Sequence, residues 1–226
     1  MKRRALAIFD LDYTLLEGDS EELWARFLFR QGLVDAAFVG RIEAFYRDYE
    51  AGQLDFRVYE EFLLGPLTVR PAEVLLELRR VCLDELRKFI RPKMIARVEL
   101  HRQENAQLVL ITACNSFLAE PLAELLGFAE VICSQVELVD GEYTGRTCGV
   151  PAFRHGKVIR LAGWLRDHPF SLAGSWCYGD SYNDLPLLEL VDHPVMVAPD
   201  AKLRKHGLER GWELLEREGR EVMSNE

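Results

Sequence analysis

Five short apolar segments without polar alternation constrain the fold of this chain more than any other feature. They are 5–9 (ALAIF), 107–111 (QLVLI), 130–133 (EVIC), 175–178 (SWCY) and 195–198 (VMVA). Segments of this length and composition are typical of parallel strands that are covered on both faces. The amphipathic segments between them predict crossover helices at 117–126, 156–167 and 182–192. This alternation predicts an α/β fold with a Rossmann-like parallel sheet.

The stretch from 16 to 90 interrupts the alternation. Its apolar residues recur at helical spacing, and it contains no convincing strand. Pro92 stands where the strand–helix pattern resumes. We therefore expect an α/β core domain formed by 1–15 and 91–226, with an inserted all-helical cap domain formed by 16–90. Such a cap is expected to move as a lid about hinges at its two ends.

Two segments of the core depart from the strand–helix pattern. Between 134 and 150, alternating runs flank Asp140-Gly141, and this dipeptide is a strong signal for a β-hairpin. The charged segment 213–226 is expected to be a frayed, solvated end.

The charge balance limits the class of partner. The 226 residues include 28 Lys and Arg against 37 Asp and Glu, a net charge of −9, so a nucleic-acid-binding surface is not expected. No apolar run approaches the roughly 18 residues of a membrane span, and the apolar run after the basic start is too short for a signal peptide. The five dispersed cysteines contain no C-x-x-C pair, which argues against a disulfide framework or zinc cluster. We expect a cytoplasmic protein with a small-molecule partner, and the oligomeric state stays open.

Polar side chains follow three of the predicted strands. Asp10 and Asp12 come directly after the first strand, Thr112 follows the second, and Asp180 and Asp184 follow the strand at 175–178. The carboxyl ends of parallel strands meet in one crevice, where open α/β sheets bind ligands. A plainer interpretation also exists, because aspartates after strands often cap turns.

The crowding of acidic residues at this crevice predicts a cation. Four carboxylates would repel one another without one, and Mg²⁺ prefers oxygen ligands together with substrate phosphate. One aspartate would remain free to attack phosphorus, a known role of carboxylates. Lys157, at the start of the predicted helix 156–167, is placed to neutralise a bound anion, although a lone lysine is commonly a surface charge.

Four ordered motifs carry a resemblance to a known family. Asp10-x-Asp12-x-Thr14, Thr112, Lys157 and Gly179-Asp180-Ser181-x-Asn183-Asp184 resemble the motifs of the haloacid dehalogenase superfamily. The resemblance extends from residue 5 to about residue 200, and the helical insertion is similar to that of the phosphoserine-phosphatase-like subgroup.

The resemblance implies a Mg²⁺-dependent phosphatase that acts on a small phosphate monoester. By this resemblance Asp10 is the nucleophile that forms an aspartyl-phosphate, and Asp12 is the general acid and base. The ligands of Mg²⁺ would be Asp10, the backbone carbonyl of Asp12, and Asp180. An acid at position 12 also argues against a dehalogenase, because a halide leaving group needs no proton.

The resemblance further implies how the substrate is held. Thr112 and the backbone N–H of Ala113 would bind phosphoryl oxygens, with Lys157 balancing their charge and Asp184 orienting Lys157 or a metal-bound water. The remaining residues expected at the substrate are Ser181, Asn183 and, at the cap entrance, Asp19.

The substrate itself is suggested by charge. Phosphoserine phosphatases of this subgroup bind the substrate carboxylate with an arginine, and alignment places Glu60 or Glu61 near that position here. Segment 17–90 has 15 acidic and 10 basic residues, a net charge of −5. We therefore expect an amino-alcohol phosphate such as histidinol phosphate, with phosphoserine or another small metabolite as the alternative. Asp19 also fits a simple helix N-cap.

Three other functions compete with this interpretation. A phosphorelay receiver also uses an aspartate, a hydroxyl and a lysine, but it would be about half this length and would lack the insertion. The spacing of Cys148 and Arg154 matches the C-x₅-R pattern of a thiol phosphatase, but no apolar strand precedes Cys148. A catalytically silent phosphate-binding scaffold of the same fold is the non-enzyme alternative.

Overall fold

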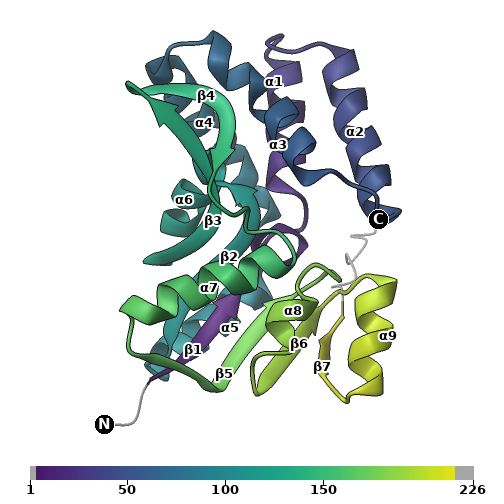
Figure 1. Cartoon of the computed structure of the whole chain (residues 1–226), viewed down its shortest axis with the longest axis vertical. Coiled ribbons are helices and arrows are strands. Elements are labelled where there is room, and N and C mark those ends of the chain that lie inside the picture. Colours follow the sequence, from purple (N-terminus) through teal and green to yellow (C-terminus); the bar gives the residue numbers. More distant parts are fainter. Residues whose placement is uncertain (1–3, 217–226) are drawn as a thin grey trace, which may run out of the picture.

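A computed structural model describes residues 4–216, and its centre is a seven-stranded sheet in the order β4-β3-β2-β1-β5-β6-β7 (Figure 1). Neighbouring strands are parallel except β3 and β4, which are antiparallel. The strands are β1 (Arg4–Phe9), β2 (Gln107–Asn115), β3 (Glu130–Val139), β4 (Glu142–Cys148), β5 (Phe170–Gly179), β6 (His193–Val197) and β7 (Glu213–Leu215). The predicted α/β fold is confirmed.

Helices cover both faces of the sheet, which explains why the central strand β1 is apolar on both of its sides. Ala7 and Phe9 of β1 belong to one buried cluster, together with residues of α5 (Pro92–Gln103) and α6 (Ser116–Leu125). Leu6 and Ile8 belong to a second cluster on the opposite face, together with residues of α7 (His155–Asp167), α8 (Leu185–Leu188) and α9 (Ala201–Glu209). Alternate side chains of one strand therefore reach two cores.

The chain between β1 and α5 is helical, as predicted for the insertion. Aspartates begin three of these helices, because Asp19, Asp35 and Asp55 each accept hydrogen bonds from backbone N–H groups of the first turn. After the short turn η1 (Leu11–Leu15), the elements are α1 (Ser20–Arg30), α2 (Ala36–Glu50), α3 (Phe56–Leu64), η2 (Gly65–Val69), α4 (Ala72–Leu86) and η3 (Arg87–Phe89).

Part of the insertion shares the main core. Trp24 of α1 and Leu75 of α4 lie in the same buried cluster as β1 and β2, and the Trp24 ring centroid lies 5.4 Å from that of Phe117 on α6. By contrast, the buried residues of α2 belong to a separate cluster, which consists of Ala25, Ile42, Phe45, Tyr59 and Leu63.

The structure differs from the sequence expectations in two places, the expected helix 182–192 and the expected frayed end 213–226. Only α8 forms a helix within 182–192, because residues 180–184 make the turn that follows β5. Residues 213–215 form the edge strand β7, whereas the rest of the expected frayed end, 217–226, lies outside the described residues. The predicted hairpin is present, with left-handed φ angles of 53° at Asp140 and 86° at Gly141.

No helix among residues 4–216 is both long and apolar enough to cross a membrane.

Close packing at the start of α7 generates a stability prediction. A Cβ added at Gly156 would lie 2.0 Å from the carbonyl oxygen of Pro151, so we expect Gly156→Ala to lower the free energy of unfolding by about 1–3 kcal/mol. In the same helix, the nearest atom to a Cβ added at Gly163 is 3.7 Å away. Gly163→Ala is the matched control and should stabilise the protein by roughly 0.5–1 kcal/mol. Urea unfolding measures both, and equal effects would contradict the prediction.

Candidate active site

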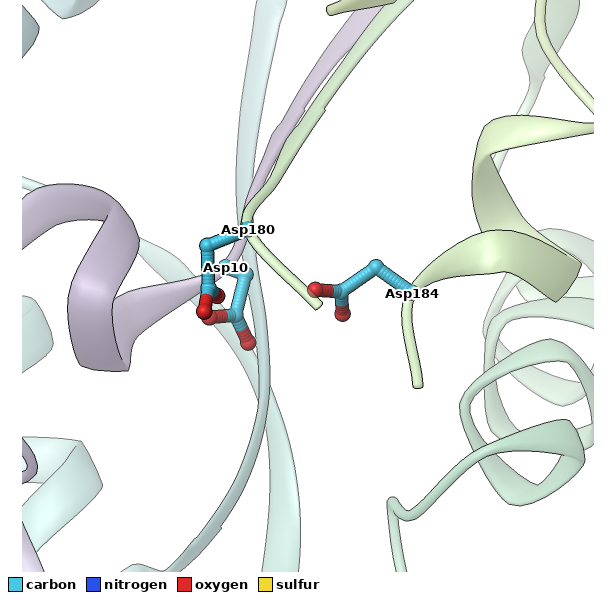
Figure 2. Close-up of side chains that lie close together, drawn as sticks. All are labelled: Asp10, Asp180 and Asp184. Carbon is cyan, nitrogen blue, oxygen red and sulfur yellow. The ribbon is translucent and has the colours of Figure 1, made fainter. Parts of the chain in front are cut away.

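Three carboxylates meet at the carboxyl edge of the sheet. Asp10 follows β1, Asp180 follows β5 and Asp184 precedes α8, and one oxygen of each lies within 4.8 Å of the others (Figure 2). Lys157 of α7 joins them, since its Nζ donates hydrogen bonds to Asp10 Oδ1 at 2.6 Å and to Asp184 Oδ1 at 2.5 Å. The structure thus brings together four residues from three of the predicted motifs.

The sheet register and one glycine bring these residues together. Because Phe9 pairs with Tyr178 in neighbouring parallel strands, Asp10 and Asp180 leave the sheet side by side. A Cβ at Gly179 would lie 2.6 Å from the Cβ of Asp184. Glycine therefore leaves the space that the buried Asp184 side chain occupies against the end of β5.

Burial and charge set the proton affinities of this cluster. Burial raises the pKa of Asp10 to about 7, even though the neighbouring Lys157 charge lowers it. Burial and the charges of Asp184 and Asp10 raise the pKa of Asp180 well above its usual range. Burial alone would lower the pKa of Lys157, but the charges of Asp10 and Asp184 outweigh it and raise that pKa. Clustered carboxylate oxygens are the ligands that a hard cation such as Mg²⁺ prefers.

Asp12 lines the same cleft as Asp10 and contacts the start of the insertion. Its Oδ1 accepts a hydrogen bond from the backbone N–H of Ser20, the first residue of α1, at 2.7 Å. Burial, followed by the charges of Asp19 and Asp10, raises the pKa of Asp12 well above its usual range. The Asp12 carboxyl group therefore has a strong tendency to hold a proton.

Thr112 and Ala113 line the same cleft at the end of β2. Thr112 is buried, and its Oγ1 accepts a hydrogen bond from the backbone N–H of Cys114 at 3.1 Å. Residues 112–115 are the irregular end of β2, where the pairing with β3 shifts register between Ile111 and Asn115; we call this end of the strand the loop 112–115.

The cleft has a volume of about 630 Å³ and lies between the sheet edge and the insertion. The insertion contributes aromatic and acidic residues to its wall. The aromatic residues are Phe45, Tyr46, Tyr49, Phe56 and Tyr59, and the acidic residues are Asp19, Glu21 and Glu50. Among the described residues, the segment 16–90 contributes no lysine or arginine to the cleft lining.

The other predicted substrate residues also line the cleft but have protein partners. Ser181 donates from its backbone N–H and its Oγ to Asp184 Oδ2, both at 3.3 Å. Asn183 donates to the Tyr49 hydroxyl at 2.8 Å and accepts from Arg154 Nε at 3.2 Å. The sequence allowed two roles for Asp19, a residue at the substrate and a helix N-cap. In the structure Asp19 lines the cleft and also caps α1, because it accepts a 2.8 Å hydrogen bond from the backbone N–H of Glu22.

The expectation that Glu60 or Glu61 lies near the substrate is wrong. Neither residue lines the cleft. Glu60 is buried and accepts a hydrogen bond from Thr147 of β4 at 2.8 Å, and Glu61 is exposed. Cys148 of the C-x₅-R pattern is also exposed and outside the cleft lining, whereas Arg154 is in it.

Several cleft residues had no recognisable signal in the sequence. Glu21 and Tyr49 fit ordinary helix positions, and only the folding of the insertion over the sheet edge brings them to the site. Phe153 lies just before α7 and lines the cleft from the core. The short run Asp19-Ser20-Glu21-Glu22 indicated a helix start, which is correct, but not that Glu21 would be buried.

Similarity to known proteins agrees with this geometry. A family model described as haloacid dehalogenase-like hydrolase matches residues 7–189. A histidinol-phosphatase of Neisseria meningitidis serogroup C (strain 8013) is 40% identical over 216 residues, which cover 93% of this chain and 97% of that protein. A solved protein of unknown function from Bordetella pertussis Tohama I is 36% identical, with a TM-score of 0.88 over 95% of this chain and 99% of that one. A substrate-bound phosphoserine phosphatase shares the fold, with a TM-score of 0.72 at 15% identity over 96% and 95% of the two chains.

The fold, the ordered motifs and these matches define a hydrolase with an aspartate-rich site at the carboxyl edge of a parallel sheet. The chain belongs to the haloacid dehalogenase-like hydrolase family. Within that family it is a phosphatase, so the predicted enzyme class is confirmed and the receiver interpretation is wrong.

Glu21 generates a prediction on the pH dependence of stability. Burial and the charge of Asp19 raise the pKa of Glu21 to about 8, with a smaller contribution from Glu60. A carboxyl group with a raised pKa in the folded state stabilises the fold at acid pH, and this contribution is lost as the pH rises from about 4.5 to about 8. Glu21→Gln should therefore show a smaller fall in unfolding free energy between pH 5 and pH 8 than the wild type.

The measurement is urea unfolding in EDTA, which keeps metal binding out of the comparison. Glu22→Gln is the control, because Glu22 lies in the same turn of α1 with its side chain paired to Arg26. It should retain the wild-type pH dependence. An unchanged pH dependence in Glu21→Gln would contradict the assignment.

Proposed function

We propose that this protein is a Mg²⁺-dependent phosphomonoesterase in which Asp10 forms an aspartyl-phosphate. The observation that carries the proposal is the cluster of Asp10, Asp180 and Asp184 with the buried Lys157. Asp10, Asp180 and the backbone carbonyl of Asp12 would hold Mg²⁺, with Asp184 beside them. When bound, the ion supplies charge neutralisation to the phosphoryl group during transfer.

The proposed first half of the reaction consumes the substrate ester. A carboxylate oxygen of Asp10 bonds to phosphorus as the bond between phosphorus and the ester oxygen breaks. Asp12 donates its proton to that oxygen, and its raised pKa supports this role. Thr112 and the backbone N–H of Ala113 bind phosphoryl oxygens, and the Lys157 ammonium balances their charge.

The second half releases phosphate. A water oxygen attacks phosphorus, Asp12 takes a proton from that water, and the bond between Asp10 and phosphorus breaks. Asp10 returns to a carboxylate and inorganic phosphate leaves, so atoms and charge balance. The helical insertion 16–90, which we assign as a cap domain to the core formed by 1–15 and 91–226, would shield these steps from bulk water.

The substrate we propose is histidinol phosphate. Its ammonium and imidazole groups match the cleft wall formed by 16–90, which contributes carboxylates and aromatic rings; the lysines and arginines of the described lining come from the core, and they are Arg91, Arg154, Lys157 and Lys202. Aromatic faces also attract cations. A relative that is 40% identical across almost its whole length is named histidinol-phosphatase, which supports the same choice. Phosphoserine is the second candidate, favoured only by the shared fold with phosphoserine phosphatases.

The cellular compartment we propose is the cytoplasm. All five cysteines are free, as expected of a protein in a reducing environment.

The chemical proposal is tested at Asp10 and at the metal. Asp10→Asn should reduce turnover of 4-nitrophenyl phosphate to background while the protein stays folded, because the amide is not a nucleophile. EDTA should abolish wild-type activity and added Mg²⁺ should restore it. Near-normal turnover by Asp10→Asn would overturn the assignment, and an inactive wild type with Mg²⁺ would favour the scaffold.

The general acid is tested at Asp12. The turnover rate of Asp12→Asn should be about 10²–10⁴-fold lower than that of the wild type.

The substrate proposal is tested with a panel of phosphate esters at fixed Mg²⁺. We expect kcat/KM to be highest for histidinol phosphate, compared with phosphoserine, phosphoethanolamine and sugar phosphates. Asp19→Asn should lower kcat/KM for histidinol phosphate about tenfold, the size of one charge-assisted hydrogen bond, and should leave a neutral sugar phosphate unchanged. Arg26→Gln, at an exposed surface pair, is the control. A preference for phosphoserine would contradict the proposal.

A further inference from the structure

Glu21 is a buried acidic residue of the cleft to which the reaction above gives no role. It lies in the first turn of α1 and is 5% exposed. Its Oε1 accepts hydrogen bonds from the backbone N–H of Asn115 at 2.9 Å and from Asn115 Nδ2 at 2.6 Å. The Tyr59 hydroxyl of α3 lies 2.8 Å from its Oε2. Both carboxyl oxygens are therefore engaged by the protein rather than available to a substrate.

The partner of Glu21 belongs to the loop that we assign to phosphoryl binding. Asn115 ends β2 and precedes α6, three residues after Thr112 and two after Ala113. Within the loop, the Cys114 N–H donates to the Thr112 hydroxyl. The two successive backbone N–H groups of Cys114 and Asn115 are thus both engaged, the first by the Thr112 hydroxyl and the second by the Glu21 carboxyl group.

Contacts outside the loop 112–115 also hold Glu21 in place, in addition to the Ser20–Cys114 contact between α1 and the loop. The helix that carries it packs into the main core through Trp24 and Phe27. Burying a carboxyl group in such a position is costly unless it is hydrogen-bonded, and an apolar side chain would fill the space at lower cost. The three hydrogen bonds therefore indicate a role that requires an acceptor, not only volume.

We propose that Glu21 is a positioning residue that holds the loop 112–115 in the conformation that receives the phosphoryl group. It acts through Asn115 and does not touch the substrate. The inference rests on the proposed phosphoryl-binding role of Thr112 and Ala113. It adds a residue from the insertion to the machinery that determines phosphate affinity.

The test compares three substitutions at Glu21, which separate the effect of the hydrogen-bond acceptor from the effect of the side-chain volume. Glu21→Gln keeps an oxygen acceptor for Asn115, Glu21→Leu fills the space without one, and Glu21→Ala removes both. With Mg²⁺ present, we measure the inhibition constant of inorganic phosphate against hydrolysis of 4-nitrophenyl phosphate. We expect the constant to rise about tenfold in Glu21→Leu and Glu21→Ala, because two loop donors lose their buried acceptor. It should stay within about twofold of wild type in Glu21→Gln.

Stability is measured on the same samples by thermal unfolding. If Glu21 has a purely structural role, Glu21→Leu should be at least as stable as Glu21→Gln and should bind phosphate at least as tightly. That result would overturn the proposal. Glu22→Ala, one residue along the helix and paired with Arg26 at the surface, is the control and should match the wild type.

The double variant Asn115→Ala with Glu21→Leu tests whether Glu21 acts through Asn115. It does not depend on Glu21→Ala being able to fold. Asn115→Ala removes the Nδ2 donor, so its effect and that of Glu21→Leu on phosphate affinity should be less than additive when combined. Additive effects would contradict the proposal. A wild type that hydrolyses no phosphate ester would instead contradict the proposed function, so the two failures are distinguishable.

Discussion

The Lys157 ammonium, enclosed between Asp10 and Asp184, is the contact on which the site depends. Three carboxylates close together and largely out of water would repel one another strongly, and the single ammonium offsets one negative charge. When all three carboxylates are ionised, two negative charges remain. One divalent cation would neutralise this remaining charge. The proposed Mg²⁺ requirement therefore follows from the charges of the same four residues.

The backbone around Lys157 is arranged to place that ammonium. Arg154, just before α7, adopts a left-handed φ of 49°, and Gly156 passes so close to Pro151 that a side chain would collide with its carbonyl oxygen. On the opposite side, Gly179 leaves room for the Asp184 side chain. Two glycines that lack any chemistry of their own therefore determine whether the charged groups can meet.

The sequence predicted the place of a site residue correctly where that place depends on the local pattern of apolar residues and on the geometry of a parallel sheet. Asp10 and Asp180 could be placed together because each follows an apolar strand, and parallel strands direct their carboxyl ends to one edge. Glu21 and Tyr49 could not be placed, because their positions depend on how the insertion packs over that edge. Glu60 was assigned to the wrong place for the same reason: the packing of α3 against β4 turns it toward Thr147.

The division of buried residues within the insertion has a consequence for how a substrate reaches the cleft. Rotation of all of 16–90 about its ends would expose Trp24 and Leu75, which belong to the main core. By contrast, α2 buries only Ile42 and Phe45, both in the small cluster inside the insertion. The core domain and the insertion are thus continuous at α1 and α4 through shared buried side chains. At α2 they are linked across the cleft by the hydrogen bond from Asn183 to the Tyr49 hydroxyl, so a displacement of α2 would break this contact and leave Trp24 and Leu75 buried.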